Sequence, residues 1–402
     1  MTRSKQRLAA LALAAATALV AACGGGGSDG GDAGVGTGGS GYAVGTVTGF
    51  GSVIIDGAAW NESGARVQVE NDPSFGPVAA TVKLGQRVQI DYETEPHAKV
   101  IEIGAAAIGP VQAVDTSGPA PLLRVAGQIV RANLDITAGP VTLFEGYASA
   151  LGIAPGDLVE VHGVPVPSGA SYILQASRIE KLTALPGGLV RVQNIVQQFN
   201  PSARSLRLGD ITVSTASAPV LPAGATIANG RTVTVWARSP AGAMTSLTAE
   251  FVKVRDLSGN TRPSDLSGTV TGLDAVARSF EIAGVRVTAA SATLVPANAV
   301  LSNGDFAVVR GSFRQDGTLA ATQVRIRKPG VTPGFDYAVS LTGPVTDFVS
   351  LADFRVRGVR VDASTANQRA CAGNVVIGNG LDVEIGGAIA GDRVVADLLF
   401  CR

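Results

Sequence analysis

The chain repeats one short pattern at nearly constant spacing, and this repetition limits its fold more than any other feature. Each copy alternates apolar and polar residues around a central Gly, as in Phe280–Val287 and Phe354–Val361. The central position recurs at intervals of 70, 83, 74 and 74 residues, at Gly57, Gly127, Asp210, Gly284 and Gly358. Self-similarity at a fixed period indicates a small structural unit copied in tandem.

A second pattern lies downstream in each copy and keeps the same period. It is a Gly followed by another short alternating run. These glycines recur at intervals of 71, 74, 74 and 76 residues, at Gly85, Gly156, Gly230, Gly304 and Gly380. Because two independent anchors share one period, the sequence predicts about five copies of the unit.

The repeated runs predict short β-strands rather than helices. Alternation at period two is typical of a strand with one buried face. The chain contains 51 Gly among 402 residues, and each Gly costs about 1 kcal/mol relative to Ala inside a helix. We therefore expect an all-β protein, a tandem array of about five small OB-like β-barrels, with a small open sandwich as the alternative for each unit. Closing each unit into a barrel would remove the sheet edges that invite aggregation.

Composition shifts and turn-rich stretches set the expected boundaries. Residues 1–22 are expected to form a signal peptide and residues 23–41 a Gly-rich tether. The expected β modules are 42–104, 105–182, 183–256, 264–329 and 336–402.

The N-terminus predicts a lipid-anchored envelope protein. Basic residues at positions 3, 5 and 7 precede an uncharged run over 8–22, which suits a secretory signal and is short for a membrane span. Val20-Ala-Ala-Cys23 resembles the bacterial lipobox, so Cys23 is the expected lipidated residue. An ordinary cleaved signal peptide is the alternative. Among such lipoproteins, Gly rather than Asp at position 24 favours an outer-membrane anchor, with the folded part either periplasmic or surface-exposed.

The two remaining cysteines, Cys371 and Cys401, lie in the last 32 residues. In an oxidising periplasm they are expected to form a disulfide that closes a loop of about 30 residues, worth on the order of 3–4 kcal/mol. A metal site is the competing interpretation, but no other Cys and no nearby His is available for it.

Charge excludes one class of partner and suggests a surface for another. The formal net charge is zero, and without residues 1–22 it becomes −3, which gives no electrostatic basis for binding nucleic acid. Aromatic residues make up only 5%, so few side chains are available to stack on sugar rings. Six arginines form a candidate basic face for an envelope protein, an anionic glycan or a lipid headgroup, with edge charge that blocks strand pairing as the plainer interpretation: Arg286, Arg325, Arg327, Arg355, Arg357 and Arg360.

No catalytic constellation, cofactor site or metal site is expected. The chain has two His, of which His162 is expected at the surface end of a strand and His97 in an exposed loop. Asp91, Glu93 and Glu95 alternate and are interpreted as a solvated edge, with a calcium site or a carboxylate pair as the alternative.

The first unit carries a resemblance to a known family. Gly45–Gly57, Trp60, Leu84–Val88 and Ala98–Glu102 together resemble the repeat of uncharacterised proteobacterial lipoproteins that contain the domain of unknown function 5666. The resemblance extends over most of residues 42–402 and is weakest in the second and third units. It implies a tandem β-module lipoprotein and brings no catalytic residue.

The function expected from the sequence is that of a non-enzymatic scaffold, anchored in the outer membrane, that binds a partner or supports the envelope. Binding of a small ligand or oligosaccharide by one module is the alternative, and an envelope hydrolase is the third candidate.

Overall fold

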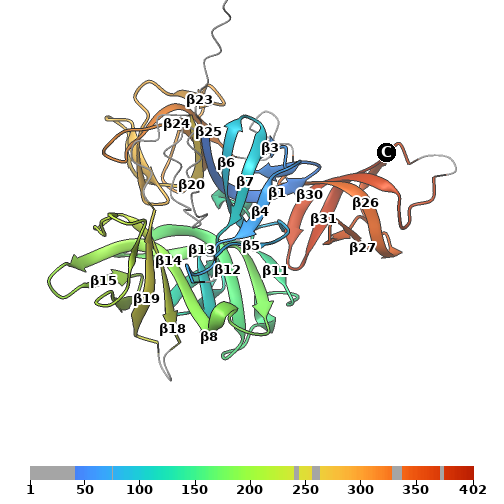
Figure 1. Cartoon of the computed structure of the whole chain (residues 1–402). Helices are drawn as coiled ribbons and strands as arrows, with labels where there is room; N and C mark the ends of the chain where they lie inside the picture. Colours follow the sequence, from blue (N-terminus) through green and yellow to red (C-terminus); the bar gives the residue numbers. More distant parts are fainter. Residues whose placement is uncertain (1–40, 75, 240–243, 256–262, 328–336, 372–374) are drawn as a thin grey trace, which may run out of the picture. The chain divides into compact units, whose positions relative to one another are not determined.

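The computed structural model confirms the all-β prediction (Figure 1). It describes residues 41–402 except 75, 240–243, 256–262, 328–336 and 372–374. Within these ranges the only helical elements are three single 3-10 turns, η1 (Ile136–Ala138), η2 (Ala150–Gly152) and η3 (Pro186–Gly188). The predicted signal peptide, Cys23 and the tether up to residue 40 lie outside the described residues, whereas Gly41 already belongs to the first strand.

The strands fall into five groups in chain order. The β1–β7 group contains β1 (Gly41–Phe50), β2 (Val53–Ile55), β3 (Ala58–Trp60), β4 (Arg66–Val69), β5 (Val78–Ala79), β6 (Arg87–Thr94) and β7 (His97–Ile103). The β8–β13 group contains β8 (Ala107–Asp115), β9 (Leu122–Val125), β10 (Gln128–Ala132), β11 (Leu143–Glu145), β12 (Leu158–Ser168) and β13 (Ser171–Leu182). The β14–β19 group contains β14 (Leu189–Asn200), β15 (Ser205–Leu208), β16 (Ile211–Ser214), β17 (Val220–Leu221), β18 (Thr232–Arg238) and β19 (Ser246–Val254). The β20–β25 group contains β20 (Ser264–Asp274), β21 (Ser279–Ile282), β22 (Val285–Thr288), β23 (Thr293–Val295), β24 (Phe306–Phe313) and β25 (Leu319–Ile326). The β26–β31 group contains β26 (Val339–Ser350), β27 (Asp353–Val356), β28 (Val359–Asp362), β29 (Asn367–Arg369), β30 (Asp382–Ala390) and β31 (Arg393–Cys401).

One circuit of strand pairings recurs along the chain. In the β20–β25 group, β20 pairs antiparallel with β21, and β21 pairs antiparallel with β22. β22 runs parallel to β25, which pairs antiparallel with β24, and β24 returns to β20. The same circuit is present in the β8–β13, β14–β19 and β26–β31 groups. In the β1–β7 group, a bridge between Asn61 and His97 and the parallel pair β4–β7 complete it.

The apolar positions of the repeat fill the interiors of these circuits. Phe280 and Phe354, which open the repeated pattern in two copies, are fully buried, and Phe306 is buried as well. Burying an aromatic or aliphatic side chain of this size contributes about 1.5–3 kcal/mol. The alternation in the sequence therefore does place one face of each short strand in a core.

β1 departs from the expected one-sided burial, because all ten of its residues are buried. Besides pairing with β2 and β6 of its own group, β1 runs parallel to β20 through Tyr42–Val44 and parallel to β26 through Gly49 and Phe50. β8 and β14 likewise pair with each other, antiparallel. First strands thus join the groups into two sheets of 19 and 12 strands.

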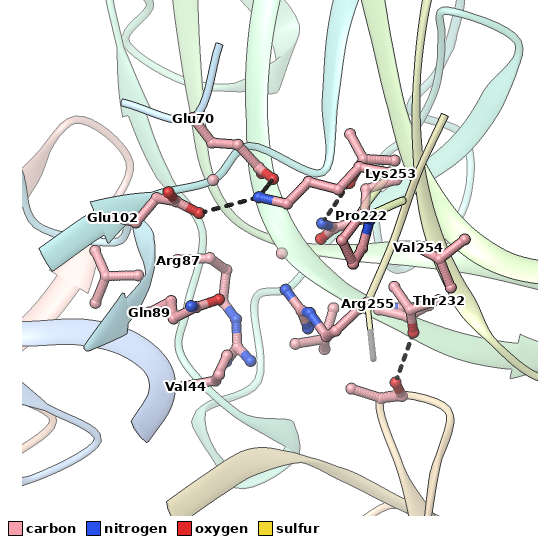
Figure 2. Close-up of a pocket in the computed structure, with 18 residues that line it drawn as sticks. Val44, Glu70, Arg87, Gln89, Glu102, Pro222, Thr232, Lys253, Val254 and Arg255 are labelled. Carbon is pink, nitrogen blue, oxygen red and sulfur yellow. Dashed lines mark hydrogen bonds and ion pairs between the residues drawn. The ribbon is translucent and has the colours of Figure 1, made fainter. Parts of the chain in front are cut away.

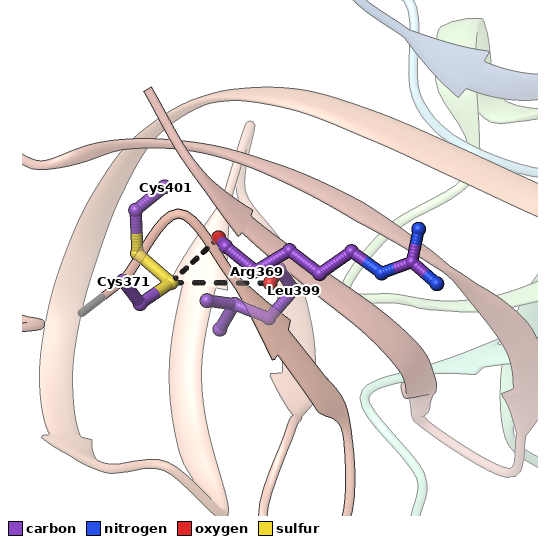
Figure 3. The surroundings of a disulfide bond; sticks show 4 residues. All are labelled: Arg369, Cys371, Leu399 and Cys401. Atoms are coloured by element: carbon purple, nitrogen blue, oxygen red, sulfur yellow. Dashed lines mark hydrogen bonds between the residues drawn. A yellow bond between two sulfur atoms is a disulfide. The ribbon is translucent and has the colours of Figure 1, made fainter.

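A disulfide fastens the last strand. The sulfur atoms of Cys371 and Cys401 lie 2.11 Å apart, at bonding distance, and their Cα atoms are 5.1 Å apart (Figure 3). Cys401 is the last residue of β31, which also pairs with β29 just before Cys371. The bridge therefore ties the end of the chain to the loop that follows β29, as the positions of the two cysteines predicted.

A glycine marks the same irregularity in the last hairpin of three groups. The register shifts at Gly163, Gly311 and Gly387. A Cβ at any of them would overlap the carbonyl oxygen of the facing strand, which is that of Ala320 in the case of Gly311. These positions require Gly because the two backbones approach closely at the bulge.

We expect Gly311→Ala to destabilise the protein by about 1–3 kcal/mol, because the added methyl group forces the backbones of β24 and β25 apart. Urea unfolding followed by circular dichroism measures the change. Gly378→Ala is the matched control, since a Cβ there meets no described atom within 4 Å. Equal unfolding midpoints for the two variants would contradict the close approach.

Candidate functional site

The strongest candidate site is a small cavity with charged walls (Figure 2). Its lining comes from four groups: β1–β7, β8–β13, β14–β19 and β20–β25. Its volume is about 60 Å³. Since one water needs roughly 10–15 Å³ on this measure, the cavity holds about four to six waters or one small ligand.

Two glutamates and a lysine form one side of the cavity. Lys253 at the end of β19 places its Nζ 2.7 Å from Glu70 Oε1 and 3.5 Å from Glu102 Oε1 (Figure 2). Arg191 on β14 pairs with the other oxygen of Glu70 and lies over the Trp236 ring, 5.5 Å from its centroid. Two carboxylates thus face two cations from another group, and these four charges balance one another.

Burial and pairing oppose each other in this cluster. Burial raises the pKa of Glu70, but Arg191 and Lys253 outweigh it and lower that pKa to about 2. Burial raises the pKa of Glu102, and the neighbouring Glu70 charge adds to the increase. Burial lowers the pKa of Lys253, yet the two glutamates raise it overall. Glu70 is therefore the carboxylate that stays ionised between Arg191 and Lys253.

Two arginines form the other side of the cavity. The guanidinium of Arg87 on β6 donates to the carbonyl oxygen and the hydroxyl of Ser267, each at 3.1 Å. Burial lowers the pKa of Arg87 to about 10, although Asp56 partly offsets this. Arg255 follows β19, and its backbone N–H donates to the Thr232 carbonyl at 2.9 Å. Its guanidinium points toward Arg87 and Gln89 (Figure 2) and has no hydrogen-bond or ion-pair partner among the described residues.

A buried carboxylate, Asp56, shares the hydroxyl of Ser267 with Arg87. Asp56 Oδ2 accepts from the backbone N–H of Thr46 at 2.9 Å and from the Ser267 hydroxyl. Burial raises the pKa of Asp56, while Arg87 and, more weakly, Arg327 lower it. The guanidinium of Arg327 lies over Gly57, where a Cβ would overlap it, and Arg327 is only 3% exposed. The prediction that Arg327 belongs to an exposed basic face is therefore wrong.

The other predicted arginines divide between two groups. Arg286 is exposed on β22 and Arg325 is half-buried on β25. Arg360 is neutralised by Asp353, with hydrogen bonds of 2.7 and 3.0 Å, and by Asp392 at 2.8 Å.

Arg355 and Arg357 are less neutralised by nearby carboxylates than Arg360 is. Arg355 donates to the Gly358 carbonyl at 2.7 Å and lies 3.7 Å from Asp347. Arg357 is exposed, and its Nε donates to the Thr342 carbonyl at 3.2 Å. This pair belongs to the β26–β31 group, whereas Arg286 and Arg325 belong to the β20–β25 group.

His162 is fully buried, so its predicted place at the surface end of a strand is wrong. Its Nε2 lies 2.7 Å from Glu160 Oε1, and its Nδ1 accepts the backbone N–H of Arg87 at 3.3 Å. β12 continues to Ser168, and the β1–β7 group covers its middle. His162 therefore joins two groups. His97 is exposed, as expected, but it is the first residue of β7 rather than part of a loop.

Glu93 at the end of β6 and Glu95 just after it lie in solvent, as expected, whereas Asp91 does not. Glu93 pairs with Lys99 at 2.7 Å, and Glu95 pairs with Arg310 at 2.6 Å. Asp91 is half-buried, and burial raises its pKa. Across the described residues, no group of three His, Cys, Asp or Glu side chains is placed to hold a metal ion. Nor does any helix in that part of the chain have the length and apolar character needed to span a membrane.

The repeated hairpin turns are a second surface of interest, because most of them contact another group. A Cβ on Gly284 would lie 2.7 Å from Ile195, and one on Gly127 would overlap Ile211. A Cβ on Gly209, beside Asp210, would lie 2.6 Å from Gln128. Gly57 is covered by Arg327. A Cβ on Gly358, by contrast, would meet no described atom within 4 Å, so the turn between β27 and β28 is open.

Sequence reasoning missed Glu70, Arg87, Glu102, Lys253 and Arg255. Lys253 and Arg255 alternate with apolar residues at the end of β19, a pattern that predicts an exposed polar strand face. The alternation is present in the structure, but the polar face is covered by another group. The residues of one repeat do not indicate that its polar strand face will be covered by another group.

Comparison with known proteins gives a match in two of the five groups. The family model of the domain of unknown function 5666 matches residues 108–180 and 267–325, which lie in the β8–β13 and β20–β25 groups. The match in the second unit corrects the expectation that the resemblance is weak there. No curated protein matches the chain. A solved structure, "drosophila Unr CSD456", is 12% identical, with 56% of this chain and 97% of that chain covered. Its TM-score of 0.15 carries no argument about fold or function.

We expect Glu70→Gln to destabilise the protein by about 3–5 kcal/mol at pH 7, because Arg191 and Lys253 lose their buried partner. Glu70 has a lowered pKa in the folded protein, so its contribution is present above its ordinary pKa of 4.5 and is lost as pH falls through about 2. The difference in unfolding free energy between wild type and variant should shrink over that window.

Urea unfolding at several pH values measures this difference. Glu93→Gln is the control, because its pair with Lys99 is more than 60% exposed on both sides and should contribute about 0–1 kcal/mol. A loss for Glu70→Gln that matches the control, or that does not vary between pH 2 and 4.5, would contradict the assignment.

Proposed function

Because residues 108–180 and 267–325 match the family of the domain of unknown function 5666, we propose that this chain is a tandem array of such domains that acts as a non-enzymatic scaffold in the cell envelope. The strand circuit supports OB-like barrels as the repeated unit. In that circuit the first three strands form a meander, the third runs parallel to the last, and the first closes the ring. A small five-stranded Greek-key barrel would have this pairing, and its recurrence along the chain supports a tandem array of such barrels.

The use of buried polar side chains supports a scaffold rather than an enzyme. Arg178 on β13 donates to the Leu84 carbonyl at 3.0 Å, and Ser177 donates to the Gly85 carbonyl at 2.7 Å. Lys83 pairs with Glu180 at 2.5 Å across the same junction. These groups use their hydrogen-bonding capacity to hold modules together, which suits a protein whose task is to present surfaces in a fixed arrangement.

The open turn of the β26–β31 group carries the proposal. The equivalent turns in the other groups are covered by a neighbouring module, whereas Gly358 has open space around it in the described part of the chain. The residue before the turn glycine is Asp56 in the first module, where cations of the chain face it, and Arg357 in the last. The turn of the last module therefore carries a positive charge where the equivalent turn of the first module carries a negative one. A positive charge favours an acidic partner, so we assign this turn to an acidic segment of an envelope partner protein.

Lipid anchoring completes the proposal. The lipobox resemblance at Val20–Cys23 and the Gly-rich residues 24–41 support an outer-membrane anchor followed by a tether.

We expect Arg357→Asn to reduce capture of the partner at least tenfold in crosslinking pull-downs from intact envelopes. Asn removes the charge and, unlike most residues, tolerates the left-handed backbone of this position, at φ 53°. Arg286→Asn, which removes an exposed charge from another module, is the matched control and should capture normally. Equal capture by both variants, or competition by an anionic glycan as strong as by an acidic peptide, would contradict an acidic protein partner.

Replacing Cys23 by Ala should abolish incorporation of radiolabelled palmitate and release the protein from the membrane fraction. The double variant Cys371→Ser/Cys401→Ser is the control and should keep the label, because those cysteines are joined to each other. Retention of label in Cys23→Ala would refute lipidation at that residue.

Binding of a small ligand is the second candidate function. The charged cavity between the modules is the observation that favours it.

A further inference from the structure

We propose that the cavity beside Arg255 is a binding site for a small oxyanion, a free or ligand-borne phosphate or carboxylate group. The proposal rests on the second candidate function, binding of a small ligand, and names the class of that ligand. It is independent of the scaffold function, because the cavity does not involve the open turn at Gly358.

The first support is the unequal pairing of the cations around the cavity. Lys253 is held between Glu70 and Glu102, and Arg87 is bonded to Ser267. Arg255 points into the same space (Figure 2) with no partner for its guanidinium among the residues the structure describes. A guanidinium presents a planar fork of donors that matches two oxygens of a carboxylate or phosphate.

Charge balance points the same way. Lys253 and Arg191 offset Glu70 and Glu102, and Asp56 offsets part of the charge on Arg87. Arg255 therefore leaves the described lining of the cavity with an excess positive charge. Arg87 and Arg255 also lie in the same cavity (Figure 2), so their positive charges repel each other, and this repulsion adds to the lowering of the Arg87 pKa. An anion between the two arginines would relieve that repulsion.

The walls of the cavity suit a small polar ligand. Thr234 accepts a hydrogen bond from Gln193 Nε2 at 3.0 Å, so its hydroxyl proton remains available to donate. Val44, Val164, Pro222 and Val254 supply apolar walls, which strengthen electrostatic interactions by excluding water. The volume of about 60 Å³ holds roughly four to six waters, close to the five heavy atoms of a phosphate.

Because the lining comes from four modules, an occupied cavity would also stabilise their packing. A ligand that binds only the folded arrangement raises its stability in proportion to the logarithm of its concentration. Thermal unfolding in the presence of a candidate anion therefore reports on occupancy.

The test is isothermal titration calorimetry and thermal unfolding of the mature protein with three probes, namely inorganic phosphate, methyl phosphate and acetate, at constant ionic strength. At least one probe should bind and raise the melting temperature. Stronger binding of methyl phosphate than of inorganic phosphate indicates a phosphoryl group carried on a larger ligand. Stronger binding of inorganic phosphate indicates free phosphate as the ligand. Binding of acetate alone indicates a carboxylate.

Arg255→Gln should weaken binding of the successful probe at least tenfold, and Arg255→Lys should recover part of it, because Lys keeps the charge and loses the fork. Arg238→Gln is the matched control, because this arginine is in the same module, 80% exposed and paired with Glu250, and the change should leave affinity unaltered. Circular dichroism of each variant checks its fold. No binding of any probe at 10 mM, or equal affinity in Arg255→Gln and Arg238→Gln, would overturn the proposal.

Discussion

The structure depends on the complete burial of β1, which pairs with strands of its own group and with strands of two later groups. Its neighbours are strands of its own module and, through parallel pairing, the first strands β20 and β26 of two later modules. Parallel pairing between segments more than 200 residues apart is costly in chain entropy and persists only because it satisfies backbone groups that would otherwise be buried without partners. β1 thus converts what would be separate units into one sheet.

The charged junctions follow from that packing. Once first strands join the modules, the polar faces of other strands meet each other instead of water. Arg87, Arg191 and Asp56 are then buried and must find partners across the junction, as they do. A buried ion-pair network adds little stability compared with apolar packing of the same volume, but removing one of its members leaves a buried charge without a partner and is costly. These residues therefore determine which surfaces can pack together more than they add to stability.

Much of the local structure could be predicted from the sequence, for identifiable reasons. Period-two alternation predicted the strands and the burial of Phe280 and Phe354, and cysteine positions predicted the disulfide that the structure contains. The surface positions predicted for His162 and Arg327 are wrong. Both residues occupy polar positions of their own strand patterns, and both are covered by residues of another module. The candidate site could not be predicted at all, since its walls come from four groups of strands that lie far apart in the sequence.

The sequence by itself determined the all-β class, the period of the repeat and the pair of cysteines that closes the chain, because alternation and turn glycines act within a few residues. Only the tertiary structure decided which polar faces are buried, which hairpin turns are covered by another group, and that Arg255 points into the cavity without a partner among the described residues. Those outcomes depend on contacts between repeats that resemble one another in sequence, and resemblance between repeats does not specify which of them pack together.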